Sequence, residues 1–192
     1  MTNKILFLAL FLCNLFYGCK KHTTVPANPV DQLPPATQVG ANTFGCLVDG
    51  QVVVIHKPLF DLSPDYNCFY QLIYNSTTGY VFYLSATDKT DGCHFKEVGI
   101  RLDSLALEEM TYPLNTLQVK GGRSGIFSIS NSCSLPVTGY YTDNTVTGEL
   151  TITHFDQQQQ IVSGTFYFNA IEQTTGDTVH VTNGRFDMHY TD

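Results

Sequence analysis

Apolar and polar positions alternate in short runs from Thr43 to the end of the chain, and turn residues separate the runs about every ten positions. This spacing is typical of β-sandwiches and β-barrels. The alternation is clearest in the last third, where three long strands are expected at 146–155, 161–172 and 178–190. In the second of them Phe166 and Phe168 share one face, and Tyr167 lies on the other. One face is therefore expected in the core and one in solvent, as in an antiparallel sheet.

Turn residues between these runs predict hairpins and bulges. Asp49-Gly50 joins the runs 43–48 and 51–56, and this dipeptide favours the positive φ angles of a type I′ turn. Gly164 and Asn183-Gly184 interrupt two of the long strands and predict bulges or bends. Further strands are expected at 68–75, 80–86, 93–102, 126–130 and 137–142, and a single helical turn at 104–110.

Together these segments predict one all-β domain, an antiparallel meander of about nine to ten strands. Two ways of closing it fit the pattern. A β-sandwich has its core filled by side chains and is the favoured arrangement. The alternative is a lipocalin-like up-and-down barrel, which encloses a ligand cavity.

The first part of the chain has a different pattern. Residues 1–18 carry Lys4 and then an apolar run from Ile5 to Leu12, which is too short to cross a bilayer of about 30 Å and is typical of a signal peptide. The run ends in Gly18-Cys19, as in a lipobox, which predicts a lipid on Cys19 and a membrane anchor. Residues 19–42, with four prolines and many small polar residues, are expected to be a flexible linker to a domain at 43–192.

Charge narrows the range of partners. Charged residues make up 14% of the chain, and the net charge is −7. From residue 44 onward seven Lys and Arg face sixteen Asp and Glu, so the domain alone carries about −9. Nucleic acids and anionic membrane surfaces require a basic footprint, so neither is expected to bind this domain.

Four cysteines remain in the mature domain: Cys46, Cys68, Cys93 and Cys133. An even number in an exported chain predicts disulfides, and four cysteines allow three pairings. Cys46 alternates with Phe44 and Val48, so a buried free thiol is the alternative for it. No pair has the spacing of a zinc site, and neither a metal nor another cofactor is expected.

The residue types that catalyse reactions show no spacing typical of an active site. The six histidines have no metalloprotease spacing, and no nucleophile is tied to a base by its position. A polar patch is expected on the solvent face of the last strands and would suit a sugar or a peptide. Its residues are Tyr167, Asn169, His180, Arg185, Asp187 and His189. A solvated sheet face is the alternative interpretation.

Four segments resemble an uncharacterised family of Bacteroidetes-type lipoproteins: 33–50 (LPPATQVGANTFGCLVDG), 148–156 (GELTITHFD), 163–170 (SGTFYFNA) and 179–190 (VHVTNGRFDMHY). The resemblance implies an exported, lipid-anchored, all-β domain of unknown activity, and it brings no catalytic residues. Surface-displayed lipoproteins of this type carry acidic residues after the lipidated cysteine. Here Lys20-Lys21 follow it, which favours the periplasmic face of the outer membrane over the cell surface.

Three functions fit these features. The favoured one is a non-catalytic binding or structural module of the cell envelope, because an anchor and a linker are present without a catalytic set. The alternatives are a lipocalin-like carrier of a small apolar ligand and a glycan-directed enzyme that uses Asp187 and His189. The sequence is compatible with a glycan, a protein or a small apolar ligand as the partner.

Overall fold

The structure is a computed structural model, and it describes residues 28–56, 59, 62, 64–72, 79–117, 119 and 121–192. The predicted signal peptide, the predicted lipidation site Cys19 and the first part of the predicted linker lie outside these residues. Within the described part of the chain, no helix is long and apolar enough to cross a membrane.

The described residues form eleven strands and one short 3-10 helix. In chain order they are η2 (Pro29–Gln32), β1 (Thr43–Val48), β2 (Gln51–Val54), β3 (Tyr66–Leu72), β4 (Tyr80–Lys89), β5 (His94–Asp103), β6 (Thr111–Leu114), β7 (Arg123–Asn131), β8 (Thr138–Tyr141), β9 (Gly148–Asp156), β10 (Ile161–Ile171) and β11 (Thr178–His189).

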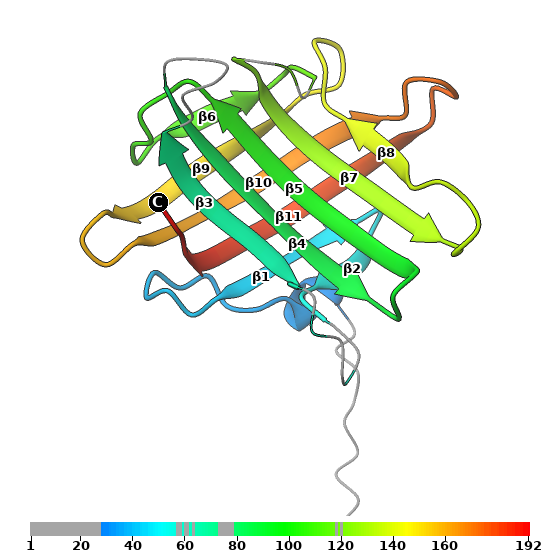
Figure 1. Cartoon of the computed structure of the whole chain (residues 1–192), viewed down its shortest axis with the longest axis horizontal. Helices are drawn as coiled ribbons and strands as arrows, with labels where there is room; N and C mark the ends of the chain where they lie inside the picture. The colour runs from blue at the N-terminus through cyan, green and yellow to red at the C-terminus, as the bar shows by residue number, and fades with distance from the viewer. Residues whose placement is uncertain are drawn as a thin grey trace, which may run out of the picture.

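All eleven strands belong to one antiparallel sheet that curls into a half-barrel. In Figure 1, the green strands β3, β4, β5 and β7 cross in front of the yellow-to-red strands β9, β10 and β11. The two layers are joined through β8, whose Tyr141 pairs with Ile171 of β10. The first strand, β1, pairs with the last, β11, so segments far apart in the sequence are neighbours in the sheet. The predicted all-β antiparallel fold is confirmed, with eleven strands where about nine to ten were expected.

Side chains from both layers fill the space between them. Phe82 of β4 and Phe186 of β11 come from opposite layers, and their ring centroids lie 6.5 Å apart. Fully buried aliphatic residues also come from both sides, among them Leu84 of β4 and Ile152 of β9. The interior at these positions is packed as in other protein cores.

The predicted turn and bulges are found where the glycines indicated. Asp49 and Gly50 both have positive φ, 49° and 78°, which confirms the type I′ hairpin turn. In β11, an extra residue at Thr182-Asn183 shifts the register with β10, and Asn183 has φ 55°. Next to Gly164 the register with β9 also shifts, and the extra residue is on β9.

One local prediction was wrong, and one strand was missed. The segment 104–110 forms no helix, because long-range contacts use its backbone: Ser104 N donates to Tyr80 O and Leu107 N donates to the Tyr70 hydroxyl. Strand β6 was not predicted. It is four residues long and contains Pro113, which is tolerated there because β6 is at an edge and pairs with β9 alone.

Candidate functional site

The outer face of β9, β10 and β11 carries cross-strand rows of polar residues. In one row Tyr167 of β10 is opposite Glu149 of β9. In the next, Thr165 of β10 lies between Thr151 of β9 and Arg185 of β11. In a third, Ser163 of β10 is opposite Asp187 of β11. The alternation predicted for these strands therefore places polar side chains of neighbouring strands together on one surface.

Asp187 is fully buried although it lies on the polar face of its strand. Its carboxylate accepts five hydrogen bonds, four of them from the segment 37–41 that precedes β1. The donors are Thr37 Oγ1 (2.6 Å), Val39 N (3.0 Å), Gly40 N (2.8 Å), Ala41 N (3.2 Å) and Ser163 Oγ (2.8 Å). Within the described residues, the charge is thus stabilised by dipoles and not by a cation.

These hydrogen bonds determine the acidity of Asp187. Burial by itself raises the pKa of the carboxyl, whereas the hydrogen bonds, led by those from Thr37, Val39 and Ser163, stabilise the charged form. The net result lowers the pKa from 3.8 to about 2. A buried, fully bonded carboxylate of this acidity is a poor proton acceptor and is closed to ligands.

The segment 33–42 crosses the outer face and holds this arrangement in place. Pro34 packs on Gly45 of β1, where an added Cβ would lie 2.6 Å from Pro34 Cδ. Gln38 donates to the Thr153 carbonyl of β9, and Asn42 Oδ1 accepts from His189 N. Leu33 is buried as well. We call residues 33–42 the latch. The predicted flexible linker extended to residue 42. In the structure, its last part, residues 33–42, is instead bound to the sheet.

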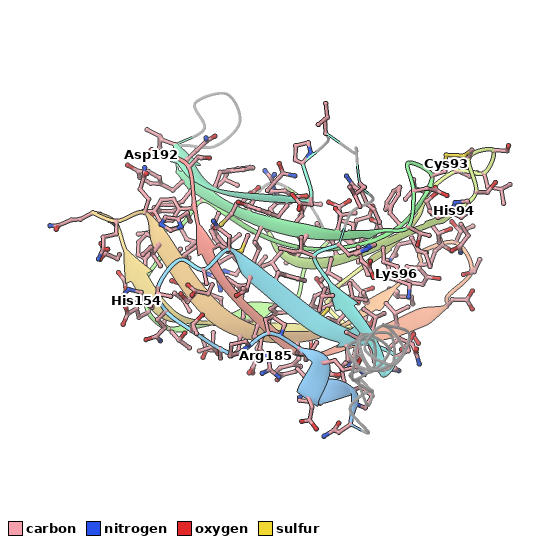
Figure 2. The ribbon with its side chains drawn as sticks, turned by 90° about the horizontal axis from the view of Figure 1, so that it is seen from below. Cys93, His94, Lys96, His154, Arg185 and Asp192 are labelled. Atoms are coloured by element: carbon pink, nitrogen blue, oxygen red, sulfur yellow. A yellow bond between two sulfur atoms is a disulfide. The ribbon has the colours of Figure 1, made fainter. Side chains whose placement is uncertain are left out.

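Beside the latch, the same outer face forms an open groove of about 460 Å³. Tyr167 is 49% exposed within it. Figure 2 places Arg185 on the underside of the lower layer, next to the blue N-terminal segment. The groove is lined by Ala36, Glu149, Thr151, Thr165, Phe166, Tyr167, Asn183, Gly184 and Arg185. Its volume is within the range of about 300–1,000 Å³ that is typical of small-molecule sites.

The electrostatics of the groove are balanced. Glu149 and Arg185 contribute one charge of each sign, and the other lining side chains are neutral. A hydrogen bond to Glu149 raises the pKa of the Tyr167 hydroxyl, because the carboxylate accepts from the protonated phenol. Among the described residues, no side-chain hydrogen bond or ion pair engages Arg185. Its guanidinium is therefore available to a ligand.

The structure divides the polar patch that was expected from the sequence. Tyr167 and Arg185 belong to the groove. Asn169 and His180 are bonded to each other at 2.7 Å on the next cross-strand pair. His189 lies against Gly40 of the latch, and Asp187 lies beneath the latch. The expectation that Asp187 belongs to an exposed patch is corrected, because the preceding segment covers it.

Of the four domain cysteines, Cys93 and Cys133 form a disulfide, whereas Cys46 and Cys68 are free and buried. Burial raises the pKa of both free thiols to about 12, so they stay protonated and unreactive. The disulfide closes a sequence separation of 40 residues, a loop for which chain entropy contributes about 4 kcal/mol of stability. Figure 2 shows Cys93 at a corner of the molecule away from Arg185, so the disulfide is remote from the groove.

The described residues contain neither a metal-binding cluster nor a paired nucleophile at the groove. No group of three or more His, Cys, Asp or Glu side chains in the described ranges could hold a metal ion. In the groove the ionisable side chains are Glu149, Tyr167 and Arg185, and no serine or cysteine lines it. This set can bind and orient a polar molecule, and it contains no nucleophile paired with a base.

Several residues of this surface were not predicted. In the sequence, Glu149, Thr151 and Thr165 are ordinary polar positions of alternating strands, and nothing marks them as parts of one site. Thr37 and Gly40 lie in a segment without periodicity, and nothing local connects them to Asp187. The turn residues Gly40-Ala41-Asn42 were the available signal, since Gly40 and Asn42 both have positive φ.

Residues 75–188 match the family model described as "Domain of unknown function (DUF6252)". The matched range begins before β4, ends within β11 and covers more than half of the chain. No curated protein and no solved structure matches the chain. The match agrees with the resemblance to an uncharacterised family, and its description assigns no activity. The chain belongs to the family of the domain of unknown function DUF6252.

Proposed function

We propose that this protein is a non-catalytic binding module of the bacterial cell envelope, tethered by a lipid on Cys19. The observation that carries the proposal is the groove beside the latch. It is open and holds an exposed tyrosine and an unengaged guanidinium. Ligand sites typically combine a pre-formed hollow with a few convergent polar groups of this kind.

The latch also determines the geometry of the tether. Helix η2 packs against β1 and β2, so the chain leaves the domain near this corner. Nine residues, 20–28, separate Cys19 from Pro29. Even with this segment fully extended, Cys19 and Pro29 are at most about 35 Å apart. The domain would therefore remain close to the lipid surface, which we propose to be the periplasmic face of the outer membrane because Lys20-Lys21 follow the anchor.

The two other functions have less support. A carrier of a small apolar ligand needs an internal cavity, and the ring contacts between Phe82 and Phe186 occupy the space between the layers. A glycan-directed enzyme would depend on Asp187 and His189. Asp187 is buried and fully hydrogen-bonded, so it has no access to a substrate.

The anchor is tested by growing cells that express the full chain with an alkyne fatty acid and detecting the label on the purified protein. Wild type and Cys13→Ala should carry the label, and Cys19→Ala should lose both the label and membrane association. Cys13 is a matched control, because it is a second cysteine of the same apolar segment. A labelled Cys19→Ala protein, or an unlabelled wild type, would contradict the proposed anchor.

Binding at the groove is tested without assuming a ligand. Hydroxyl-radical footprinting compares the full chain in intact envelopes with the purified protein in detergent. Tyr167 should be protected in envelopes, whereas Tyr80, which is 44% exposed on another strand, should react equally in both samples. Equal modification of Tyr167 in the two samples would contradict a binding role for the groove.

A further inference from the structure

We infer that the groove binds a neutral oligosaccharide. This inference rests on the proposed function and names the class of ligand for the same site. Three properties of the groove lead to it: an exposed aromatic face, a set of planar polar groups beside that face, and a net charge of zero.

The aromatic face is that of Tyr167, whose side chain is half exposed on β10. Its hydroxyl is engaged by Glu149 on the neighbouring strand, which restrains the ring. The face of an aromatic ring is apolar and carries negative charge density. It therefore attracts the weakly positive C–H groups on one side of a pyranose ring, which a flat peptide group does not offer.

The polar groups complement sugar hydroxyls. Every sugar hydroxyl both donates and accepts, so a suitable site must offer both functions. Glu149 supplies acceptors and Arg185 supplies a fork of donors. The side chains of Asn183, Thr151 and Thr165 each do both. The planar, forked groups of Glu149, Arg185 and Asn183 match pairs of neighbouring hydroxyls.

A backbone irregularity brings Asn183 to this position. The bulge in β11 inserts the extra residue at Thr182-Asn183, and Asn183 takes the left-handed conformation with φ 55°. Bulges commonly redirect a side chain beside a site, and a non-glycine residue in this region costs conformational energy. Gly184 follows without a side chain, and both residues line the groove.

Charge selects neutral ligands. Glu149 and Arg185 cancel within the groove, while the surrounding domain carries about −9. An acidic glycan or a nucleotide would be repelled by the domain and would find one guanidinium opposite a carboxylate. The groove is open rather than enclosed, so it can accept one unit of a longer chain.

The test is a titration of the full chain, purified from membranes in a detergent without a sugar head group and labelled with fluorotyrosine. The neutral probes are maltohexaose, cellohexaose, xylohexaose and mannohexaose, and the acidic probe is polygalacturonate. At least one neutral probe should shift the Tyr167 resonance saturably. Tyr167→Ala should weaken binding about tenfold or more, measured by calorimetry, and Tyr80→Ala should bind as wild type does.

Each outcome decides a different point. A neutral probe that binds equally to Tyr167→Ala would place the site elsewhere and overturn the inference. A Tyr167 shift with polygalacturonate alone would also overturn it while leaving the groove a binding site. Protection of Tyr167 in envelopes without a response to any probe would reject the saccharide and keep the proposed function. If Tyr167 is neither protected in envelopes nor shifted by any probe, both the proposed binding function and the saccharide inference are rejected.

Discussion

The outer face of β9, β10 and β11 has two halves that differ in one respect, namely whether a segment covers them. At Ser163 and Asp187 the latch lies over the sheet and supplies hydrogen bonds to the buried carboxylate. At Tyr167 and Arg185 the sheet is open, and the guanidinium has no partner in the described part of the chain. Polar residues at equivalent positions of the same strands thus stabilise the fold in the covered half and remain available to a ligand in the open half.

The comparison shows why strand alternation alone is a weak guide to function. Asp187 and Arg185 are two residues apart on the same face of β11, and a sequence pattern treats them alike. The two side chains differ in access. Thr37 and Gly40, which precede β1, donate hydrogen bonds to Asp187, whereas neither donates one to Arg185. Access, rather than residue type, separates a structural carboxylate from a candidate ligand-binding group.

The largest expected effect is on the covered half. Asp187→Ala removes the acceptor of five hydrogen bonds, two of them buried and three partly buried. It should lower the free energy of unfolding by about 3 kcal/mol, because the donors would lose their partner or need water. Urea unfolding of the full chain in detergent measures this change. Hydrogen exchange of Val39, Gly40 and Ala41 should accelerate together as the latch detaches.

Asp177→Ala is the matched control, since it removes an aspartate from an exposed turn of the same sheet. Its unfolding free energy should stay within about 0.5 kcal/mol of wild type. If the Asp187 and Asp177 variants were equally stable, the latch would contribute nothing and the division of the outer face would have no energetic basis.

The next effect is a pH dependence of the covered half. The folded pKa of Asp187 is lowered from 3.8 to about 2, so the unfolded chain takes up its proton first as the pH falls. Stability from this group is complete above about pH 4 and is lost as the pH falls through about 2, a change of about 2 kcal/mol.

Asp187→Asn isolates this contribution. The exposed Asp91 and Asp143 also have pKa values lowered to about 2. Both are present in the wild type and in the variant, so their contributions cancel when the pH dependence of the two unfolding free energies is compared. The wild type should lose more stability than the variant between these pH values in acid titrations followed by urea unfolding. Parallel pH profiles would show that the buried carboxylate is not stabilised by its hydrogen bonds.

The smallest stability effect is expected on the open half. Arg185→Gln should change the free energy of unfolding by less than about 0.5 kcal/mol, because Arg185 has no partner among the described residues. The same change should weaken binding of the oligosaccharide identified in the titration about tenfold, measured by calorimetry. A loss of stability without a change in affinity would assign Arg185 to the structure instead.

Much of the fold could be predicted from local patterns. The hairpin at Asp49-Gly50 and the bulge at Asn183-Gly184 depend on backbone conformations that these residues favour, and both are present. Strand β6 and the segment 104–110 could not be predicted in this way. Their conformations depend on β9 and on the Tyr70 hydroxyl, which are distant in the sequence.

The candidate site was predictable in part. Tyr167 and Arg185 were selected because alternation places them on a solvent face, and both line the groove. Asp187 was selected on the same grounds and is buried, because the latch that covers it looked like a flexible linker. Glu149 was not selected, since its pairing with Tyr167 depends on the register between β9 and β10.

The most direct test of this account measures two quantities on one variant, Tyr167→Ala: the affinity for the neutral oligosaccharide and the free energy of unfolding. We predict that the affinity falls about tenfold or more while the unfolding free energy stays within about 0.5 kcal/mol of wild type, as for an exposed side chain that serves a ligand. An unchanged affinity would contradict the account, and a loss of about 2 kcal/mol or more in stability would make Tyr167 part of the fold.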